Sequence, residues 1–124
     1  MKIPLLISHA RVQREPATQG DAVPLIKLGH CYLSFNVVLV LAKQGARLDA
    51  MLDRLEVGDY GIVGMDWTRD NDLAIPIDGR VVSLYRVLAD DVMKTMTPQQ
   101  RRHAPFIWIV TEKGTTIAFT ELDR

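Results

Sequence analysis

The chain has 124 residues, of which 48% are hydrophobic; this suits one folded domain with its own core and is too apolar for intrinsic disorder. Fifteen basic and fifteen acidic residues give a formal net charge of zero. This balance excludes a strongly basic nucleic-acid-binding protein, although a local basic stripe is compatible with it.

Strands are predicted first along the chain. Residues 3–12 form a first strand, with Pro4 tolerated near an edge, and residues 22–28 form a second strand or an irregular edge. Residues 32–42 are predicted as a long central strand, because residues two apart make a fully apolar face. That face consists of Leu33, Phe35, Val37, Leu39 and Leu41. A buried helix is the alternative for so long a run, but the central valines and the terminating Gly45 favour a strand.

A short helix is predicted next, over residues 46–55. Its apolar residues fall at i, i+3, i+4 and i+7 and are Leu48, Met51, Leu52 and Leu55. A helix of this length is not stable alone, so we expect it to cover a core.

The following segment, residues 60–67, is predicted as a curved strand, because Gly61 and Gly64 favour bulges and tight curvature. A polar loop over 68–72 leads to a short strand at 73–77.

Asp78-Gly79 is a typical two-residue hairpin turn, which predicts a return strand over Arg80 to Leu88. The same residues also form a helical stripe, so a helix remains the alternative there.

The carboxyl-terminal part begins with a helical segment over 89–96 and a short helical turn that opens at Thr97-Pro98. Residues 106–111 and 115–121 are rich in Val, Ile, Thr and aromatic residues and predict a β-hairpin.

Two stretches carry a family resemblance. The stretch LLISHARVQREP at residues 5–16 is an apolar strand that leads through a small turn to a proline, and LEVGDYGIVG at 55–64 follows the predicted helix. Both resemble bacterial single-stranded DNA-binding proteins and the primosomal replication protein family, over roughly residues 3–88. Three features depart from the family pattern: its usual glycine is His9 here, its Trp-rich third strand carries Tyr32 and Phe35, and its acidic carboxyl-terminal tip is absent.

The resemblance implies an OB-fold, a small five-stranded barrel with one helix between its third and fourth strands. The expected fold class is therefore mostly β (α+β): a single domain with an OB-like core over 3–88. The helix and hairpin of residues 89–124 would extend this core, joining the barrel, pairing with another subunit or forming a separate interaction surface.

Single-strand binding requires aromatic side chains for base stacking beside cations for phosphates. The candidate residues are Arg11, Arg14, Tyr32, Arg47, Trp67, Arg69, Arg80, Tyr85 and Arg86. The alternative is that the aromatic residues belong to the core and the arginines to a solvated surface. A small basic cluster at Arg101 to His103 is either a further phosphate contact or a solubilising turn.

Catalytic and metal signatures are missing from the sequence. Asp66, Asp70, Asp72 and Asp78 gather in one region but lack the glycine and distal glutamate of a calcium loop, so they are expected to form turns. The histidines are scattered and Cys31 has no spaced partner, which argues against zinc. We therefore expect neither an enzyme, nor a metal, nor a cofactor.

The single cysteine excludes an internal disulfide and is compatible with a reducing compartment. No apolar run reaches the ~20 residues of a membrane span, and no targeting segment is recognised, so the sequence predicts a cytoplasmic protein without a membrane partner.

Two functions remain open. The first, implied by the resemblance, is a single-stranded nucleic-acid-binding accessory of replication, recombination or plasmid or phage maintenance, acting as a homo-oligomer. The second is a non-enzymatic protein-interaction module, a small subunit or an inhibitor, that docks through the carboxyl-terminal hairpin without nucleic acid.

Overall fold

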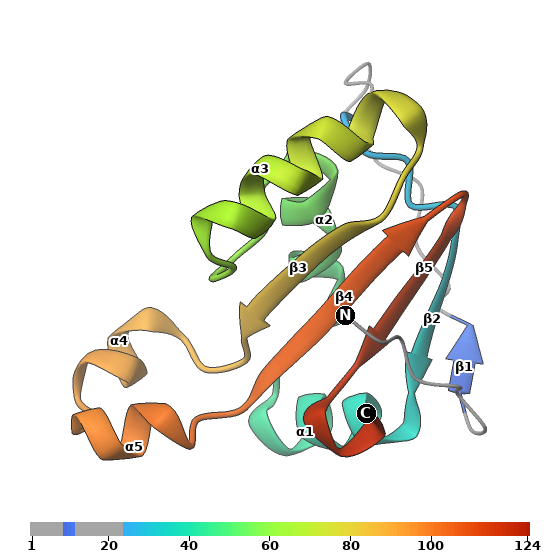
Figure 1. The fold of residues 1–124 in the computed structure, drawn as a ribbon. Helices are drawn as coiled ribbons and strands as arrows, with labels where there is room; N and C mark the ends of the chain where they lie inside the picture. Colours follow the sequence, from blue (N-terminus) through green and yellow to red (C-terminus); the bar gives the residue numbers. More distant parts are fainter. Residues whose placement is uncertain (1–8, 12–23) are drawn as a thin grey trace.

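The structure is a computed structural model that describes residues 9–11 and 24–124 (Figure 1). Its strands form one mixed sheet in the order β1-β2-β5-β4-β3. The strands are β1 His9–Arg11, β2 His30–Ser34, β3 Val81–Arg86, β4 Phe106–Glu112 and β5 Thr115–Phe119. β2 and β5 run parallel, whereas the other neighbouring strands pair antiparallel.

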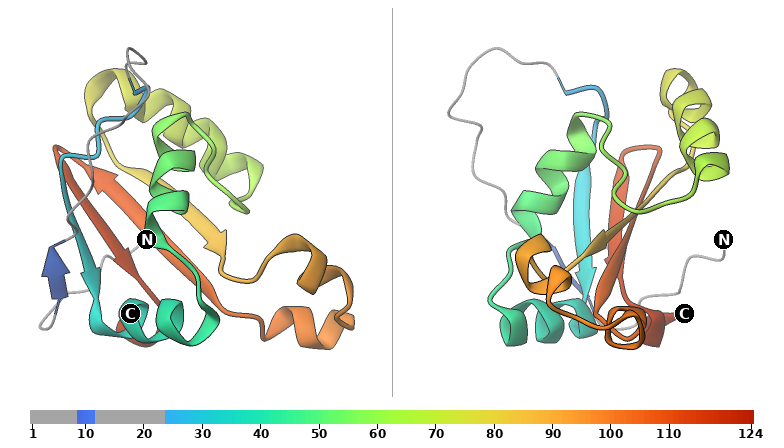
Figure 2. Two further views of the ribbon diagram at one scale, coloured as in Figure 1. Left: turned by 180° about the vertical axis from the view of Figure 1, so that it is seen from behind. Right: turned by 90° about the vertical axis from the view of Figure 1, so that its left-hand side faces the viewer.

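Helices cover both faces of this sheet. They are α1 Phe35–Gln44, α2 Leu48–Glu56, α3 Met65–Ala74, α4 Asp90–Lys94 and α5 Pro98–Arg102, with 3₁₀ turns η1 Ile75–Ile77 and η2 Glu121–Asp123. The edge-on view places α1 and α2 on one side, here named the α2 face, and α3 on the other, the α3 face (Figure 2). α4 and α5 connect β3 to β4 and extend beyond the end of the sheet (Figure 1).

Each face has its own apolar core. On the α2 face, the buried residues of α1 and α2 pack on inward side chains of the strands, among them Tyr85, Ile107 and Ile109. On the α3 face, Val82, Val110 and Phe119 are buried beneath Trp67, Trp108 and Ile117. None of the helices in the described part of the chain has the length and apolar character to cross a membrane.

The predicted OB-like barrel is wrong. β1 and β3 are the two ends of the strand order, so the sheet is open. The 106–121 hairpin, expected beyond the barrel, instead supplies β4 and β5, and β5 lies in the middle of the sheet between β2 and β4. Strand patterns in a sequence report that strands exist, whereas strand order depends on contacts between distant residues.

The predicted strand over 32–42 is wrong after Ser34, where α1 begins. The Ser34 hydroxyl accepts a hydrogen bond from the Val37 backbone N–H at 3.2 Å, which caps the helix. Gly45 ends the helix in the left-handed conformation, with φ 64°. The apolar residues of this run fit the period of a strand and that of a helix equally well, so periodicity does not distinguish the two structures. The caps at Ser34 and Gly45 identify the segment as a helix.

The predictions for residues 60–77 are also wrong, because these residues form a turn followed by α3 and η1. Gly61 has φ 74°, and a Cβ there would overlap the Leu84 carbonyl oxygen, so this glycine allows a close approach to β3. In α3, Trp67, Asn71 and Ala74 follow the helical spacing of i, i+4 and i+7 and lie toward the sheet.

The predicted hairpin turn at Asp78-Gly79 joins no two strands. It links η1 to β3, and Asp78 adopts the left-handed conformation with φ 54°. Asp78-Gly79 does form a turn before a strand, as predicted, but the element before the turn is the 3₁₀ helix η1 and not a strand.

Several local predictions are confirmed. The helical stripe of residues 46–55 is buried in α2, residues 80–88 contain strand β3, and the last two strands form a hairpin. Thr97 caps α5, accepting from the Gln100 N–H at 3.2 Å, while the Gln100 side chain accepts from the Thr97 N–H at 2.9 Å.

Two predicted amino-terminal strands lie partly outside the described residues. Of the first, residues 9–11 form β1; of the second, residues 24–28 are described and contain no strand.

Contacts from residues 60–71 cover the outer edge of β3. The buried Asn71 side chain donates to the Val82 carbonyl at 2.7 Å and accepts from the Val82 N–H at 2.8 Å. Leu84 pairs its N–H with the Tyr60 carbonyl at 3.0 Å and its carbonyl with the Ile62 N–H at 2.8 Å. These contacts satisfy backbone groups that an exposed edge strand would offer to another chain.

We expect Asn71→Leu to lower the free energy of unfolding by about 3 kcal/mol, because it leaves two buried backbone groups of Val82 without partners. Urea denaturation measures this change. The matched control is Asp70→Leu at the exposed neighbouring position, with an expected change within about 0.5 kcal/mol. Equal effects of the two substitutions would contradict the role of Asn71.

Candidate interaction surface

α1 is apolar on two of its sides. Its sequence is FNVVLVLAKQ, in which Asn36 and Lys43 share a third, polar side and Lys43 is the first charged residue. Val37 and Leu41 point into the core of the α2 face and are buried. The second apolar side faces away from the sheet.

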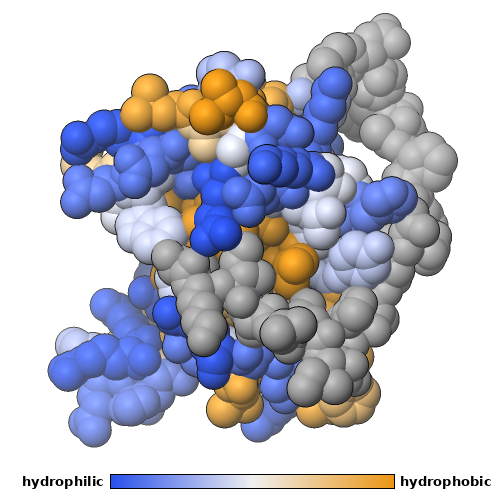
Figure 3. Space-filling view, turned by 45° about the vertical axis from the view of Figure 1, so that its right-hand side comes forward, coloured by the Kyte–Doolittle hydropathy of each residue, from blue (hydrophilic) through white to orange (hydrophobic). Residues whose placement is uncertain are grey.

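The outward side of α1 carries a continuous apolar row, here named the α1 stripe. Its members, Phe35, Val38, Leu39 and Ala42, fall at i, i+3, i+4 and i+7. Phe35 is 58% exposed, Val38 38% and Leu39 52%. Figure 3 shows separate apolar patches, with polar residues between them, at the lower rim of the molecule, the level at which Figure 1 draws α1. Contiguous exposed apolar surface marks interaction sites more often than chance exposure.

Asp123, from η2, fixes the first turn of α1. Its carboxylate accepts hydrogen bonds from the Ser34 hydroxyl at 2.6 Å, the Asn36 amide at 2.9 Å and the Thr120 N–H at 2.8 Å. Burial raises the pKa of Asp123, but these hydrogen bonds outweigh burial and hold the pKa below its usual value. The ionised carboxylate therefore stabilises the start of the helix.

The two ends of the stripe differ in charge. Asp123 places a negative charge at the amino-terminal end. Lys43 lies exposed in the last turn of α1, and Arg47, just beyond it, forms an exposed ion pair with Asp49 at 3.6 Å.

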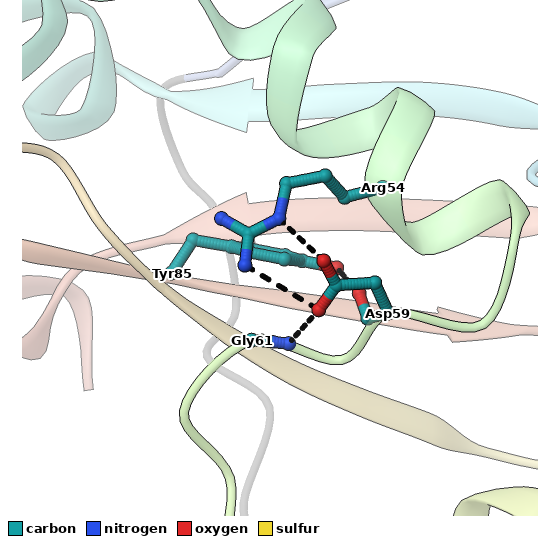
Figure 4. A network of polar contacts seen from close by, with 4 residues as sticks. All are labelled: Arg54, Asp59, Gly61 and Tyr85. Carbon is teal, nitrogen blue, oxygen red and sulfur yellow. Dashed lines mark hydrogen bonds and ion pairs between the residues drawn. The ribbon is translucent and has the colours of Figure 1, made fainter. Parts of the chain in front are cut away.

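A cavity of about 330 Å³ lies between α2 and the end of β3. Beside it, Arg54 donates through Nε to the Asp59 carboxylate at 2.7 Å, and its guanidinium carbon lies 4.9 Å from the centre of the Tyr85 ring (Figure 4). Asp59 also accepts from the Gly61 N–H at 3.0 Å, and the Tyr85 hydroxyl donates to the Asp59 carbonyl at 2.7 Å.

This network acts as a structural link. The hydrogen bond from Arg54 holds the pKa of Asp59 below its usual range, and burial raises the pKa of Tyr85 to about 12. Near neutral pH, Asp59 is thus ionised and engaged with Arg54, while Tyr85 keeps its proton. The network links α2 to the turn before α3 and to β3. It shifts the pKa of Asp59 and that of Tyr85 away from neutral pH, the range in which an acid or base catalyst works best.

The predicted nucleic-acid residues are spread over the molecule. Tyr32 and Trp67 lie on the α3 face, since Tyr32 stands opposite Ile117 in the sheet and Trp67 packs against Trp108. Tyr85, by contrast, is fully buried on the α2 face and cannot share a groove with them.

The predicted arginines are equally dispersed. Arg80 and Arg86 lie at opposite ends of β3, and Arg80 pairs with Glu112 at 3.4 Å. Arg69 pairs with Asp66 at 3.2 Å on α3. Arg47 lies just before α2; Arg11 stands opposite Tyr32 in the strand register, and Arg14 lies outside the described residues.

The four aspartates expected in turns lie mostly in a helix. Asp66, Asp70 and Asp72 belong to α3, and Asp78 alone of the four lies in a turn. Asp72 accepts a hydrogen bond from the Tyr60 hydroxyl at 2.7 Å, and Asp66 is engaged with Arg69. Across residues 9–11 and 24–124, no group of three His, Cys, Asp or Glu residues is placed to hold a metal ion.

Comparisons with protein-family models, curated proteins and solved structures find no match for this chain.

Reasoning from sequence missed the α1 stripe. The signal was present, because residues 35, 38, 39 and 42 follow a helical spacing just as well as 37 and 41 do. A segment with two apolar rows at helical spacing predicts a helix with two buried sides. Because residues 32–42 were interpreted as a strand, neither helical row was recognised.

The lowered pKa of Asp123 leads to a prediction about pH. Its ionised form stabilises the fold above the usual carboxyl pKa of about 4, and this contribution is lost as pH falls through the lower folded-state pKa. We expect Asp123→Asn to lower Tm by about 4 °C near pH 7, with the difference from the parent protein shrinking as the pH falls below about 4. Calorimetry across this pH range measures the change. The matched control is Asp78→Asn, the same exchange at an exposed aspartate. Asp78 has a left-handed backbone conformation that asparagine also tolerates, so this variant should keep the Tm of the parent protein. A Tm difference independent of pH would contradict the role of the Asp123 charge.

Proposed function

We propose that this protein is a non-enzymatic protein-interaction module that docks through the α1 stripe. The observation that carries the proposal is that Phe35, Val38 and Leu39 are 38–58% exposed on one side of a helix without a charge among them. Covering this row would remove apolar surface from water, at a gain of about 25 cal/mol per Å².

The helix is well prepared for docking. The Ser34 cap, the Asp123 carboxylate and the Gly45 end fix both of its termini, and its inward side is anchored by buried Val37 and Leu41. A rigid helix face loses little conformational freedom on binding, so more of the apolar gain appears as affinity. Amphipathic helices commonly bind by laying such a face against a groove or another helix.

The docking surface thus differs from the expected carboxyl-terminal hairpin. β5 lies between β2 and β4, and β4 lies between β5 and β3. Both hairpin strands have a neighbour on each side, so neither offers an edge for pairing.

The test is hydroxyl-radical labelling of the full chain, first in extract of the cells that make it and then after purification and dilution. We expect Phe35 and Leu39 to be labelled less in the extract, because a partner covers them there. Leu73 on α3, 68% exposed, is the internal control and should be labelled equally in both. Equal labelling of Phe35 and Leu39 in both samples would rule out the proposed surface.

A second candidate, single-stranded nucleic-acid binding, is favoured by one observation on the α3 face. The Trp108 ring centre lies 6.3 Å from that of Trp67 and 6.4 Å from that of Phe106, and Arg124 lies over Trp108 at 5.7 Å. Tyr32 lies on the same face of the sheet. Half-buried aromatic rings beside arginine provide stacking platforms for bases.

For this candidate we expect a labelled oligo-dT to bind at low salt and to dissociate as salt rises, measured by fluorescence anisotropy with a duplex control. Trp108→Ala should weaken binding about tenfold, in keeping with the loss of one stacked base. Lys113→Ala, in the exposed turn of the hairpin, is the control for a general loss of charge. A folded protein that shows no binding at low salt would eliminate this candidate.

A further inference from the structure

We infer that the partner of the α1 stripe is a second copy of this chain, with the two α1 helices packed antiparallel about a twofold axis. The inference rests on the proposed function, since it names the occupant of the same surface. Three features of the stripe support it: its spacing, the sizes of its side chains and the charges at its ends.

The spacing of the stripe is the same when read from either end. Positions 35, 38, 39 and 42 are therefore self-complementary in an antiparallel pair. Phe35 faces the partner's Ala42, and Val38 faces the partner's Leu39, with the twofold axis between the middle positions. A twofold interface requires such reciprocity, because each contact occurs twice.

The side-chain sizes fit the same arrangement. The largest member, Phe35, lies at one end of the stripe and the smallest, Ala42, at the other. Antiparallel packing places each phenyl ring over the small residue of the other helix. Parallel packing would instead place ring against ring at one end and leave a gap between the alanines at the other.

The end charges complete the match. Antiparallel packing brings Lys43 of each copy to the end where the other copy holds Asp123. Among the described residues, no ion pair of the structure involves Lys43. The two helix dipoles also oppose one another in this arrangement, whereas a parallel pair would bring the two Lys43 side chains together.

Leu73, the exposed leucine of α3, differs from the leucine of the stripe in its neighbours. Arg69 and Asp70, four and three positions before it, put charges beside it on its side of the helix. Leu39, by contrast, has Phe35 four positions before it and Ala42 three positions after it on its side of α1.

Sedimentation equilibrium of the full chain over a range of concentrations tests the inference. The 14.0 kDa chain should shift from monomer to dimer as concentration rises. Leu39→Gln should raise the dimer dissociation constant at least about tenfold, as expected for a central interface residue. Leu73→Gln, the same exchange at another exposed leucine, should leave it unchanged. Circular dichroism confirms that both variants remain folded.

Disulfide cross-linking tests the orientation, in a Cys31→Ser background that removes the buried native thiol. A mixture of Phe35→Cys and Ala42→Cys chains should form mixed disulfides, whereas Phe35→Cys chains alone should not. Cross-linking of Phe35→Cys chains to one another in place of the mixed product would indicate a parallel pair and overturn the inference.

Failure of the inference is distinguishable from failure of the proposed function. If the chain is a monomer at all concentrations but the α1 stripe is still protected in extract, the inferred dimer is wrong and the proposed interaction module is retained. If the chain is a monomer and the stripe is also unprotected in extract, both the dimer and the interaction module are wrong.

Discussion

The parallel pairing of β2 with β5 is the constraint on which the rest of the structure depends. Parallel strands end at the same edge of a sheet, so α1, which follows β2, and η2, which follows β5, begin side by side. The hydrogen bond from Ser34 to Asp123 joins them across 89 positions of sequence. At the other end of the same strands, the Thr116 hydroxyl donates to the Leu28 carbonyl at 2.7 Å. The outward direction of the α1 stripe is set by residues at the opposite end of the chain.

Local features of the fold could be predicted from the sequence. The apolar stripe of α2, the Thr97 cap and the Lys113-Gly114 turn, whose φ values are 50° and 78°, each depend on neighbours within a few positions. The strand order could not be predicted, because it depends on β5 entering between strands formed much earlier in the chain. The error at residues 35–42 has a different cause: an all-apolar run fits two periods equally, and only the paired caps at its ends distinguish them.

The candidate surfaces illustrate the same limit. Aromatic residues were the natural choice for a binding site, but a residue type does not reveal which side of a sheet it lies on. Tyr85 is held in the core by its hydrogen bond to Asp59, while Trp108, two strands from Tyr32, gathers the aromatic cluster of the α3 face. The exposed row on α1 follows from a fold in which the sheet covers only one of the two apolar sides of this helix.

The central position of the hairpin has a consequence for biosynthesis. β4 and β5, two of the three interior strands, are synthesised after the other strands of the sheet, and β2 gains its parallel neighbour only when β5 has been made. During that interval, α1 and α2 lack the completed sheet on which they bury their apolar sides. Long-range pairing of this kind slows folding and exposes apolar surface in intermediates that are prone to aggregate. A premature stop before Thr115 would remove the strand that joins β2 to β4 and would leave the sheet in two halves.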